Sequence, residues 1–315
     1  MEFLISKADE GRTVKAFLTE TLHPSNKLLR SLKFREDGIL LNGEHVTVRK
    51  LLHEGDLLTL ALDDESEEQS IEPVDLPLAI LYEDDDLVVP AKPADMPTHP
   101  SRDHHYDTVA NALAYRYRKS GTPYIFRPIN RLDRNTSGLL VVARNRLAAG
   151  RLTRSLQKGE FEKTYLAILD GVVPTDEGVL MDYLHRTEKS IILRETCPKE
   201  AEGAEYAETA FSVLLRGAAH TLVEAHPLTG RTHQLRVQFA HFGYPIAGDD
   251  LYGTENEAIG RHALHAYRLS FPHPMTGEHL TFTAPLPEDF AHFASLCFGD
   301  DFDPEKIPPR KEKIE

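Results

Sequence analysis

The chain has 315 residues, a formal net charge of −14, 41% hydrophobic and 27% charged residues, two Cys and no Trp. At roughly 150 residues per domain, this predicts about two domains with buried cores and excludes a wholly disordered chain. No apolar run approaches the roughly 18 residues of a membrane span, and the N-terminus lacks a signal peptide's basic start. The two Cys, at 197 and 297, fit neither a disulfide framework nor a zinc site. We therefore expect a cytoplasmic protein with no membrane partner, and the net charge argues at first against nucleic acid.

The acidic charge is concentrated in one stretch. Residues 57–91 contain eleven Asp or Glu and no Lys, Arg or His, so the other 280 residues carry −3 once these eleven charges are subtracted. Residues 63–77 are predicted to be an acidic linker, because like charges repel and few apolar side chains are present to order them. An acidic arm that masks the protein's own basic surface is the alternative.

The charge balance reverses further along the chain. Residues 131–163 contain eight Lys or Arg against three acids, a local charge of +5. A local basic field in an acidic chain is what contacts with nucleic-acid phosphates require, so net charge is the wrong scale for this question. Arg131, Arg134 and Lys163 of this stretch are candidate RNA contacts. A solvated basic helix face is the plainer interpretation.

Residues 1–62 are predicted to form a small first domain. TVKAFLTETL has helical spacing with Thr13 as N-cap, and SNKLLRSLKF predicts a second helix that Ser25 can cap. Asn42-Gly43 then predicts a hairpin. The basic second helix carries three candidate RNA contacts, Lys27, Arg30 and Lys33. This order of elements resembles the αL-type RNA-binding module; a packing or dimerisation appendage is the alternative.

Beyond the linker, residues 78–298 alternate strand and helix patterns. AILYEDDDLVVP predicts a hairpin, GLLVVARN a buried strand, and DTVANALAYRYRKSG a helix capped by Asp107. RLAAGRLTRSLQKG predicts a helix ending at Gly159, and EDFAHFASLCF a last helix. We expect an α+β fold, a mixed and mostly antiparallel sheet with flanking helices. Residues 299–315 are predicted to be a charged, disordered tail.

Three segments carry chemistry. In INRLDRNTSGLLVVARN, Asp133 stands between Arg131 and Arg134, which suits a carboxylate kept ionised for nucleophilic or general-base work. In FEKTY, a strand would project Lys163 and Tyr165 to one face, where the Tyr can stack on a base or move a proton. Each residue alone has a structural explanation: an ion pair for Asp133 and a half-buried sheet aromatic for Tyr165.

The third segment is HPLTGRTHQLRVQFAHFG. We expect Arg231 at the start of a helix capped by Thr232, with Leu235 and Phe239 facing the core. Arg231 would thus be held on a rigid element, as a positioned counter-ion should be.

Together these segments resemble one family. RLDRNTSGLLVVA, EKTY, GRTHQLR and YPIAGDDLYG, in this order, are similar to motifs of the RluA-type RNA pseudouridine synthases, over roughly residues 78–290. The resemblance implies the pseudouridine synthase fold and, with the first domain, the ribosomal-RNA branch of the family.

The resemblance also implies residue roles. Asp133 would attack the target nucleoside, at the uracil ring or at the ribose anomeric carbon. Tyr165 would pack against the base and move a proton, and Arg231 would form the ion pair that holds Asp133. Arg131 would enter the RNA as the uridine flips out, a rearrangement that costs a few kcal/mol. The family needs no metal and no organic cofactor.

Several positions depart from the family pattern, and at two of them the family commonly has His. Asn130 stands where His usually precedes RLD, and Gln238 stands where His is common. An Asn can keep a polar contact but not a proton-transfer role. Neither change touches Asp133, Tyr165 or Arg231, so an active enzyme is expected.

Competing functions lack their signatures. The His residues form no H-E-x-x-H pattern, and no G-x-S-x-G elbow indicates a hydrolase. A glycosidase would need two facing carboxylates. We predict a monomeric synthase that acts on structured RNA, most simply large ribosomal RNA. Transfer RNA as substrate, or a non-catalytic RNA-binding or ribosome-assembly factor, remains the alternative.

Overall fold

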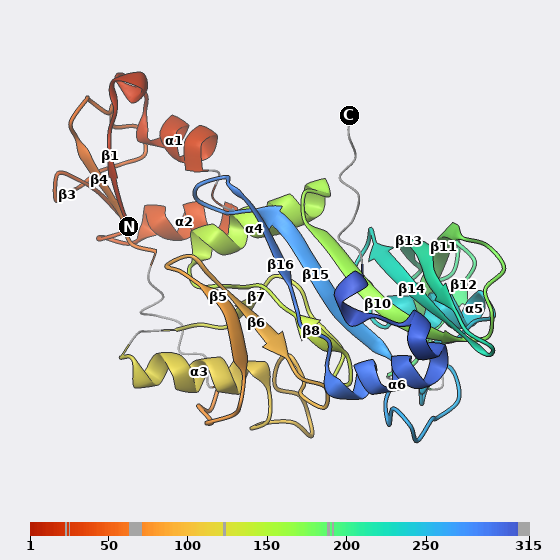
Figure 1. The fold of residues 1–315 in the computed structure, drawn as a ribbon. Helices are drawn as coiled ribbons and strands as arrows, with labels where there is room; N and C mark the ends of the chain where they lie inside the picture. Colours follow the sequence, from red (N-terminus) through yellow and green to blue (C-terminus); the bar gives the residue numbers. More distant parts are fainter. Residues whose placement is uncertain are drawn as a thin grey trace.

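The chain folds into two units, each built around its own β-sheet (Figure 1). The structure is a computed structural model and describes residues 1–22, 24, 26–62, 71–121, 124–187, 190 and 192–307. Within these ranges no helix is both long enough and apolar enough to cross a membrane.

The N-terminal unit is a four-stranded antiparallel sheet in the order β1-β4-β2-β3, with two short helices against it. Its strands are β1 (Glu2–Leu4), β2 (Ile39–Leu41), β3 (Glu44–His45) and β4 (Leu57–Leu60). Its helices are α1 (Val14–Phe17), which continues as a wider turn to Leu22, and α2 (Asn26–Phe34). The Thr13 hydroxyl caps α1, and Asn42 and Gly43 both have positive φ in the β2–β3 turn, as predicted. The predicted cap at Ser25 lies outside the described residues.

The larger unit is a mixed sheet of twelve strands, and its only parallel pair among the described residues is β8–β15. This confirms the predicted α+β fold with a mostly antiparallel sheet. One half runs β12-β11-β13-β14-β10-β15, and the other runs β8-β6-β9-β7, with β16 beside β15 and β5 beside β6. The strands are β5 (Ala79–Glu83), β6 (Leu87–Lys92), β7 (Arg127–Pro128), β8 (Ser137–Leu139), β9 (Val142–Ala143), β10 (Glu162–Asp170), β11 (Glu177–Arg186), β12 (Arg194–Cys197), β13 (Glu205–Arg216), β14 (His220–Pro227), β15 (Leu264–Pro272) and β16 (His279–Thr283).

Helices cover both faces of this sheet. Residues 139–142 near its centre are therefore all apolar, because their side chains are buried on either face. The helices are α3 (Val109–Lys119), α4 (Arg146–Lys158), α5 (Gln234–His241) and α6 (Glu288–Phe298). Leu139 and Val141 face α4, whereas Leu140 and Val142 face the core that includes α3 and α6. Side chains at alternate positions of residues 139–142 point to opposite faces of the sheet, so this one apolar segment contributes to two cores.

The helix caps correct one prediction. Asn145 caps α4 and Gly159 ends it with φ of 75°, the conformation expected of a C-terminal glycine. Helix α3 is capped by Thr108 rather than Asp107. The carboxylate of Asp107 instead lies 2.6 Å from the ring of His104, and Thr108 forms a capping box with Asn111.

The ends of the larger unit extend further than predicted. Residues 63–70 of the predicted linker lie outside the described residues, but Ile71 and Leu76 pack against the main core, and the Asn111 amide donates to the Glu72 carbonyl. The predicted disordered tail is ordered as far as Ile307, because Phe302 and Ile307 are buried in the same core. These two apolar side chains, which stand among acidic residues, pack the segment against the core. Residues 308–315 lie outside the described residues.

The N-terminal unit rests on α4 (Figure 1). Leu147 of α4 is buried in the core of the N-terminal unit, where Met275 of the β15–β16 turn also packs. Arg151 donates to the carbonyls of Thr21 and Leu22 in the N-terminal unit and to that of Pro274 in the β15–β16 turn, all at 2.7–2.8 Å. Burial lowers the pKa of this guanidinium. The two units are therefore joined by apolar packing and by a half-buried Arg that satisfies three carbonyl groups.

Gly138→Ala is expected to destabilise the fold. Gly138 has φ of 115°, and a Cβ there would lie 2.2 Å from the Ala266 carbonyl oxygen, where β8 meets β15. We expect a loss of about 2–4 kcal/mol in the free energy of unfolding, because strained backbone and steric overlap add. Gly159→Ala is the matched control: its φ is also positive, but a Cβ there meets no atom within 4 Å. Equal urea midpoints for the two variants would contradict this prediction.

Candidate active site

Asp133 lies on a loop that is held at several points. The Thr98 hydroxyl donates to the Leu132 carbonyl and accepts from the Leu132 N–H. The buried Lys92 ammonium donates to the carbonyl of Arg134 at 2.8 Å. The loop closes with the Thr136 N–H donating to the Asp133 carbonyl before β8 begins. The Asp133 side chain is about one-fifth exposed, and it lines a cavity of about 330 Å³. This cavity is large enough for a small ligand group.

The closest cation to the Asp133 carboxylate is Arg236, in the first turn of α5. Its Nη1 lies 3.7 Å from Asp133 Oδ2. The rest of the guanidinium is fixed by Asp249, which is fully buried and accepts two hydrogen bonds of 2.7 Å, and by Asp250 at 3.0 Å. Burial favours the neutral form, but the three neighbouring carboxylates outweigh it and raise the pKa of Arg236. The arginine is thus a permanent charge with a fixed orientation.

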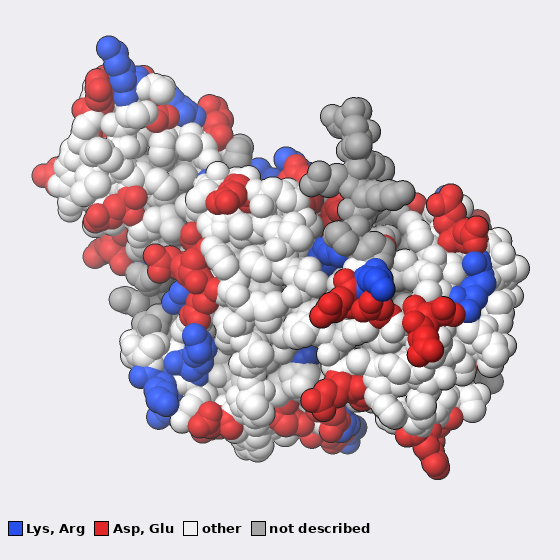
Figure 2. Space-filling model, in the orientation of Figure 1, with Lys and Arg blue, Asp and Glu red and all other residues white. Residues whose placement is uncertain are grey.

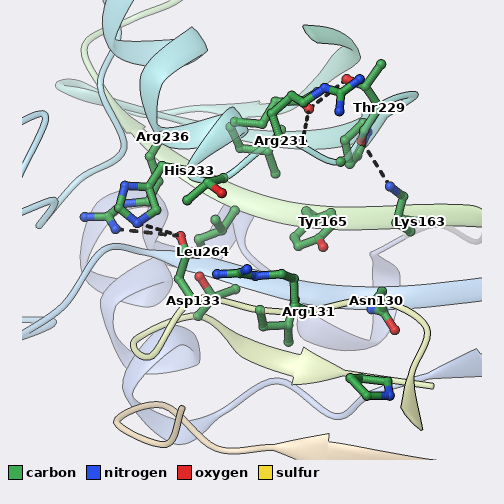
Figure 3. Close-up of a pocket in the computed structure, with 18 of the residues that line it drawn as sticks. Asn130, Arg131, Asp133, Lys163, Tyr165, Thr229, Arg231, His233, Arg236 and Leu264 are labelled. Carbon is green, nitrogen blue, oxygen red and sulfur yellow. Dashed lines mark hydrogen bonds and ion pairs between the residues drawn. The ribbon is translucent and has the colours of Figure 1, made fainter. Parts of the chain in front are cut away.

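His233 also faces Asp133. Its Nε2 lies 4.0 Å from Asp133 Oδ2, and in Figure 3 both His233 and Arg236 point toward this carboxylate. His233 immediately precedes α5 and has φ of 57°, an uncommon conformation for a residue with a Cβ. Burial lowers its pKa, an effect that the charge of Asp133 partly offsets. A neutral imidazole is therefore expected beside the carboxylate at neutral pH.

Tyr165 and Lys163 enter the cavity from β10. Tyr165 is 8% exposed, and its hydroxyl makes no hydrogen bond with the described part of the chain. Burial, and then the charge of Asp133, raise the pKa of this phenol, so it stays protonated at neutral pH. The Lys163 ammonium donates to the Thr229 carbonyl at 3.1 Å, and burial lowers its pKa to about 8. The cavity is thus lined by a carboxylate, a protonated phenol and a lysine whose charge is lost as the pH rises past about 8.

Comparison with known proteins identifies the family of this chain. A family model described as RNA pseudouridylate synthase matches residues 86–241. An uncharacterised RNA pseudouridine synthase of Bacillus subtilis is 38% identical over 279 residues, which cover 89% of this chain and 97% of the relative. The chain belongs to the RluA-type family of RNA pseudouridine synthases. It is therefore an isomerase that acts on RNA.

Further relatives agree with this assignment. The ribosomal large subunit pseudouridine synthase D of Vibrio cholerae is 36% identical over 281 residues, covering 84% of this synthase and 85% of the relative. Among solved structures, human RNA pseudouridylate synthase domain containing 1 matches with a TM-score of 0.53 and 31% identity, over 70% of this chain and 86% of that one. Human RNA pseudouridylate synthase domain containing 4 matches with a TM-score of 0.54, 25% identity, and coverage of 68% and 90%.

Arg231 does not form the ion pair that the sequence led us to expect. Its guanidinium donates to Glu205 and to the Tyr206 carbonyl, both at 3.0 Å, and it points away from Asp133 (Figure 3). The reason is that α5 begins at Gln234 and not at Thr232, so Arg231 belongs to the preceding loop. Arg236, five residues later, takes the position beside Asp133.

The other predicted RNA contacts of this synthase are dispersed. Arg131 is exposed and lines the cavity, whereas Arg134 donates to Asp95 at 2.7 Å, outside it. Arg30 and Lys33 are exposed on α2, and the side chain of Lys27 lies outside the described residues. On the face shown in Figure 2, acidic side chains lie on the N-terminal unit, near its junction with the larger unit and at the β11–β13 end. Lys and Arg side chains on that face lie in small separate groups and form no continuous basic surface.

The two departures at positions where the family commonly has His have structural roles. The Asn130 amide accepts from the Val141 N–H at 2.8 Å and donates to the Leu139 carbonyl, so it ties the loop of Asp133 to the central strands. Gln238 accepts from the buried Thr209 hydroxyl at 2.7 Å and donates to Asp182 at 2.8 Å, behind α5. Asn130 thus supports the loop that carries Asp133, and Gln238 supports the packing of the helix that carries Arg236.

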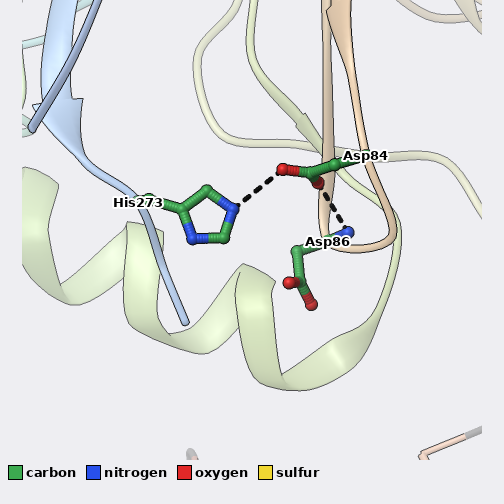
Figure 4. Close-up of side chains that lie close together, drawn as sticks. All are labelled: Asp84, Asp86 and His273. Atoms are coloured by element: carbon green, nitrogen blue, oxygen red, sulfur yellow. Dashed lines mark hydrogen bonds and ion pairs between the residues drawn. The ribbon is translucent and has the colours of Figure 1, made fainter. Parts of the chain in front are cut away.

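Asp84 and Asp86 of the β5–β6 turn lie close to His273 of the β15–β16 turn, as a metal site would require (Figure 4). However, His273 Nδ1 accepts from the backbone N–H groups of Met275 and Thr276, at 3.2 and 3.1 Å. Its Nε2 must then carry the hydrogen, which it donates to Asp84 at 2.9 Å. Neither ring nitrogen keeps a lone pair for a cation, so the cluster joins two turns instead.

Proposed function

We propose that this synthase converts uridine to pseudouridine in large-subunit ribosomal RNA, with Asp133 as the nucleophile. The observation that carries the proposal is the position of Asp133, whose Oδ2 faces Arg236 while its Oδ1 makes no hydrogen bond with the described residues. One carboxylate oxygen is thus oriented and the other is available to attack. The name of the Vibrio cholerae relative supports the choice of ribosomal RNA.

The proposed reaction conserves every atom. The glycosidic carbon–nitrogen bond breaks, the uracil rotates, and a ring carbon forms the new bond to the ribose. That carbon loses a proton, the former glycosidic nitrogen gains one, and Asp133 returns as a free carboxylate. The residues required are a nucleophile and a group that moves a proton: the Tyr165 phenol would give its hydrogen to the former glycosidic nitrogen and take the one that the ring carbon loses. The enzyme is proposed to act as a monomer in the cytoplasm, with Arg131 entering the RNA as the uridine leaves its stack.

The N-terminal unit is proposed to bind RNA as an αL-type module. Its exposed bases Arg30 and Lys33 lie on α2, which contacts α4 of the larger unit where Arg146 donates to Ser31 at 3.2 Å. Contacts to the RNA backbone from this unit would add affinity without specifying the base.

The experiment that tests the function is a comparison of pseudouridine maps. Ribosomal and transfer RNA from cells with and without this gene are mapped, and the deletion is complemented with the wild-type protein or with Asp133→Asn. We expect at least one large-subunit site to disappear and only the wild type to restore it. If no uridine site changes, the proposed activity is wrong; if only transfer RNA changes, the proposed substrate is wrong.

Tyr165→Phe is expected to lower the single-turnover rate by about 10²- to 10⁴-fold, the usual effect of removing a proton-transfer group. RNA affinity should change little, because the Phe ring keeps the packing surface. Tyr165→Ala should lower affinity as well, since stacking of a base on an aromatic ring is lost. Rates from rapid-quench assays and dissociation constants from filter binding separate the two effects. Full activity of the Phe variant would show that the hydroxyl does not move the proton.

Lys163 is expected to give the RNA affinity a pH dependence. Because burial lowers its pKa to about 8, the ammonium loses its charge as the pH rises through that value, and the affinity for phosphate falls. Protein stability changes in the opposite sense: the folded state binds the proton less tightly than the unfolded chain, so stability rises between about pH 8 and the ordinary lysine pKa. In Lys163→Met the step in RNA binding should be missing and the rise in stability should be smaller, because the buried Lys92, whose pKa is lowered to about 7, still contributes to it; titration of RNA binding and urea unfolding measure the two effects. Arg131→Met is the control that should keep the pH step.

A further inference from the structure

Tyr252 lies behind the site, in the turn that follows Asp249, and it contacts both groups that face Asp133. Its hydroxyl lies 2.8 Å from His233 Nδ1. Its ring lies under the guanidinium of Arg236, with 5.3 Å between the guanidinium carbon and the ring centroid. Asp249 Oδ1 accepts from the N–H of Tyr252 at 3.0 Å while Asp249 also holds Arg236. One short turn thus supports both donors around the carboxylate.

The hydrogen bonds of Tyr252 determine which nitrogen of His233 is protonated. The backbone N–H of Arg194 in β12 donates to the Tyr252 oxygen at 2.9 Å. Within the described residues, the only acceptor near the hydroxyl hydrogen is then His233 Nδ1. A neutral imidazole that accepts at Nδ1 carries its hydrogen on Nε2. In the opposite tautomer, with the hydrogen on Nδ1, the Tyr252 hydroxyl hydrogen would have no acceptor. The lone pair of Nε2 would then face the negatively charged Asp133 carboxylate.

We propose that Tyr252 and His233 are positioning residues: the Tyr252 hydroxyl holds His233 in the tautomer whose Nε2–H faces Asp133 Oδ2, leaving Oδ1 to attack. The distance of 4.0 Å between His233 Nε2 and Asp133 Oδ2 is longer than a hydrogen bond, and contacts of this kind shorten when substrate closes the site. This inference rests on the proposed role of Asp133. It adds a neutral donor, on the same oxygen as Arg236, that fixes the orientation of the carboxylate.

The strained backbone of His233 supports this role. Its φ of 57° directs the chain from the Arg231 loop into α5, and the ring then lies between Asp133 and Tyr252. Such a conformation costs about 1 kcal/mol or more for a residue with a Cβ, and it is commonest at functional sites. Asn or Gly would be the ordinary choice at this backbone position, so the imidazole itself is what the site uses.

The test replaces each hydrogen-bonding atom separately. In Tyr252→Phe the ring that packs against Arg236 remains, but the hydroxyl is lost. We expect the single-turnover rate to fall about tenfold, the equivalent of one hydrogen bond, with RNA affinity unchanged. The ¹⁵N chemical shifts of His233 should report the Nε2–H tautomer in the wild type and a mixture in Tyr252→Phe. Tyr106→Phe, a substitution of an exposed Tyr that does not line the cavity, is the matched control.

A pair of His233 variants makes the test specific. Gln places an amide nitrogen near Nε2 and can donate to Asp133 without help from Tyr252, whereas Asn reaches only the position of Nδ1. We expect His233→Gln to retain most of the rate and His233→Asn to lose it. Tyr252→Phe should have no further effect in the His233→Gln background.

Two results would overturn the inference: an unchanged His233 tautomer in Tyr252→Phe, or an equal loss of rate from Tyr252→Phe in both backgrounds. The tautomer is measured without substrate. It therefore tests the Tyr252–His233 contact even if the protein proves to form no pseudouridine, a result that would overturn the proposed function instead.

Discussion

Asp133→Asn is expected to abolish pseudouridine formation while the protein still folds and binds RNA. The amide has the size of the carboxylate but no charge, and a neutral amide is not a nucleophile. We expect the rate to fall at least about 10⁴-fold, as when other essential groups in a catalytic constellation are replaced. Arg236 keeps Asp249 and Asp250 as partners, so stability should change by less than about 1 kcal/mol.

The measurements are product formation in a single turnover, filter binding and thermal unfolding. Asp95→Asn is the matched control, because Asp95 pairs with Arg134 in the neighbouring loop and is exposed. It should reduce the rate only slightly. Residual activity above one-hundredth of the wild type in Asp133→Asn would exclude a nucleophilic role for this carboxylate.

Arg236→Met is expected to reduce both activity and stability. It removes the charge beside Asp133 and leaves the fully buried Asp249 carboxylate without its partner. Breaking a buried pair on one side costs about 3–5 kcal/mol. We expect the rate to fall about 10³-fold as well, because the nucleophile loses its counter-ion. Arg231→Met, five positions earlier, should change the rate by less than tenfold.

A double variant separates the two effects of Arg236. Arg236→Met with Asp249→Leu removes both charges, so much of the lost stability should return, as measured by urea unfolding. The rate should stay low, because Asp133 still lacks the guanidinium. If activity returned together with stability, Arg236 would act only through the fold. A larger loss of rate in Arg231→Met than in Arg236→Met would support the ion pair expected from the sequence.

The resemblance of RLDRNTSGLLVVA and EKTY to family motifs was sufficient to predict that Asp133 and Tyr165 share one site, and both residues line the same cavity. It was not sufficient to choose between the two arginines of GRTHQLR. The choice depends on where α5 begins, and helix termini are the least certain feature of such predictions. The signal for Arg236 was the acidic pair Asp249-Asp250 after the helix, since a buried Arg needs such partners.

Counting charges along the chain did not show which bases already have partners within the protein. The eight bases of residues 131–163 suggested one basic field, but several of them bond to other groups of the protein. Arg134 pairs with Asp95, Arg144 donates to the Asp84 carbonyl, and Arg151 binds carbonyls of the N-terminal unit. Local charge in a sequence does not distinguish bases that meet a ligand from bases that satisfy carbonyl groups, because that depends on long-range contacts.

The contact of Arg151 and Leu147 with the N-terminal unit has a consequence for substrate choice. Because that unit is held against α4 by packing, the span from α2 to the cavity is set by the folded protein and not by the reach of residues 63–70. An RNA that touches both units must therefore present its two contact points at one separation. Such an enzyme would select a uridine by the shape of the RNA around it. The distance between the uridine and the RNA that contacts α2 would matter more than the identity of the neighbouring bases.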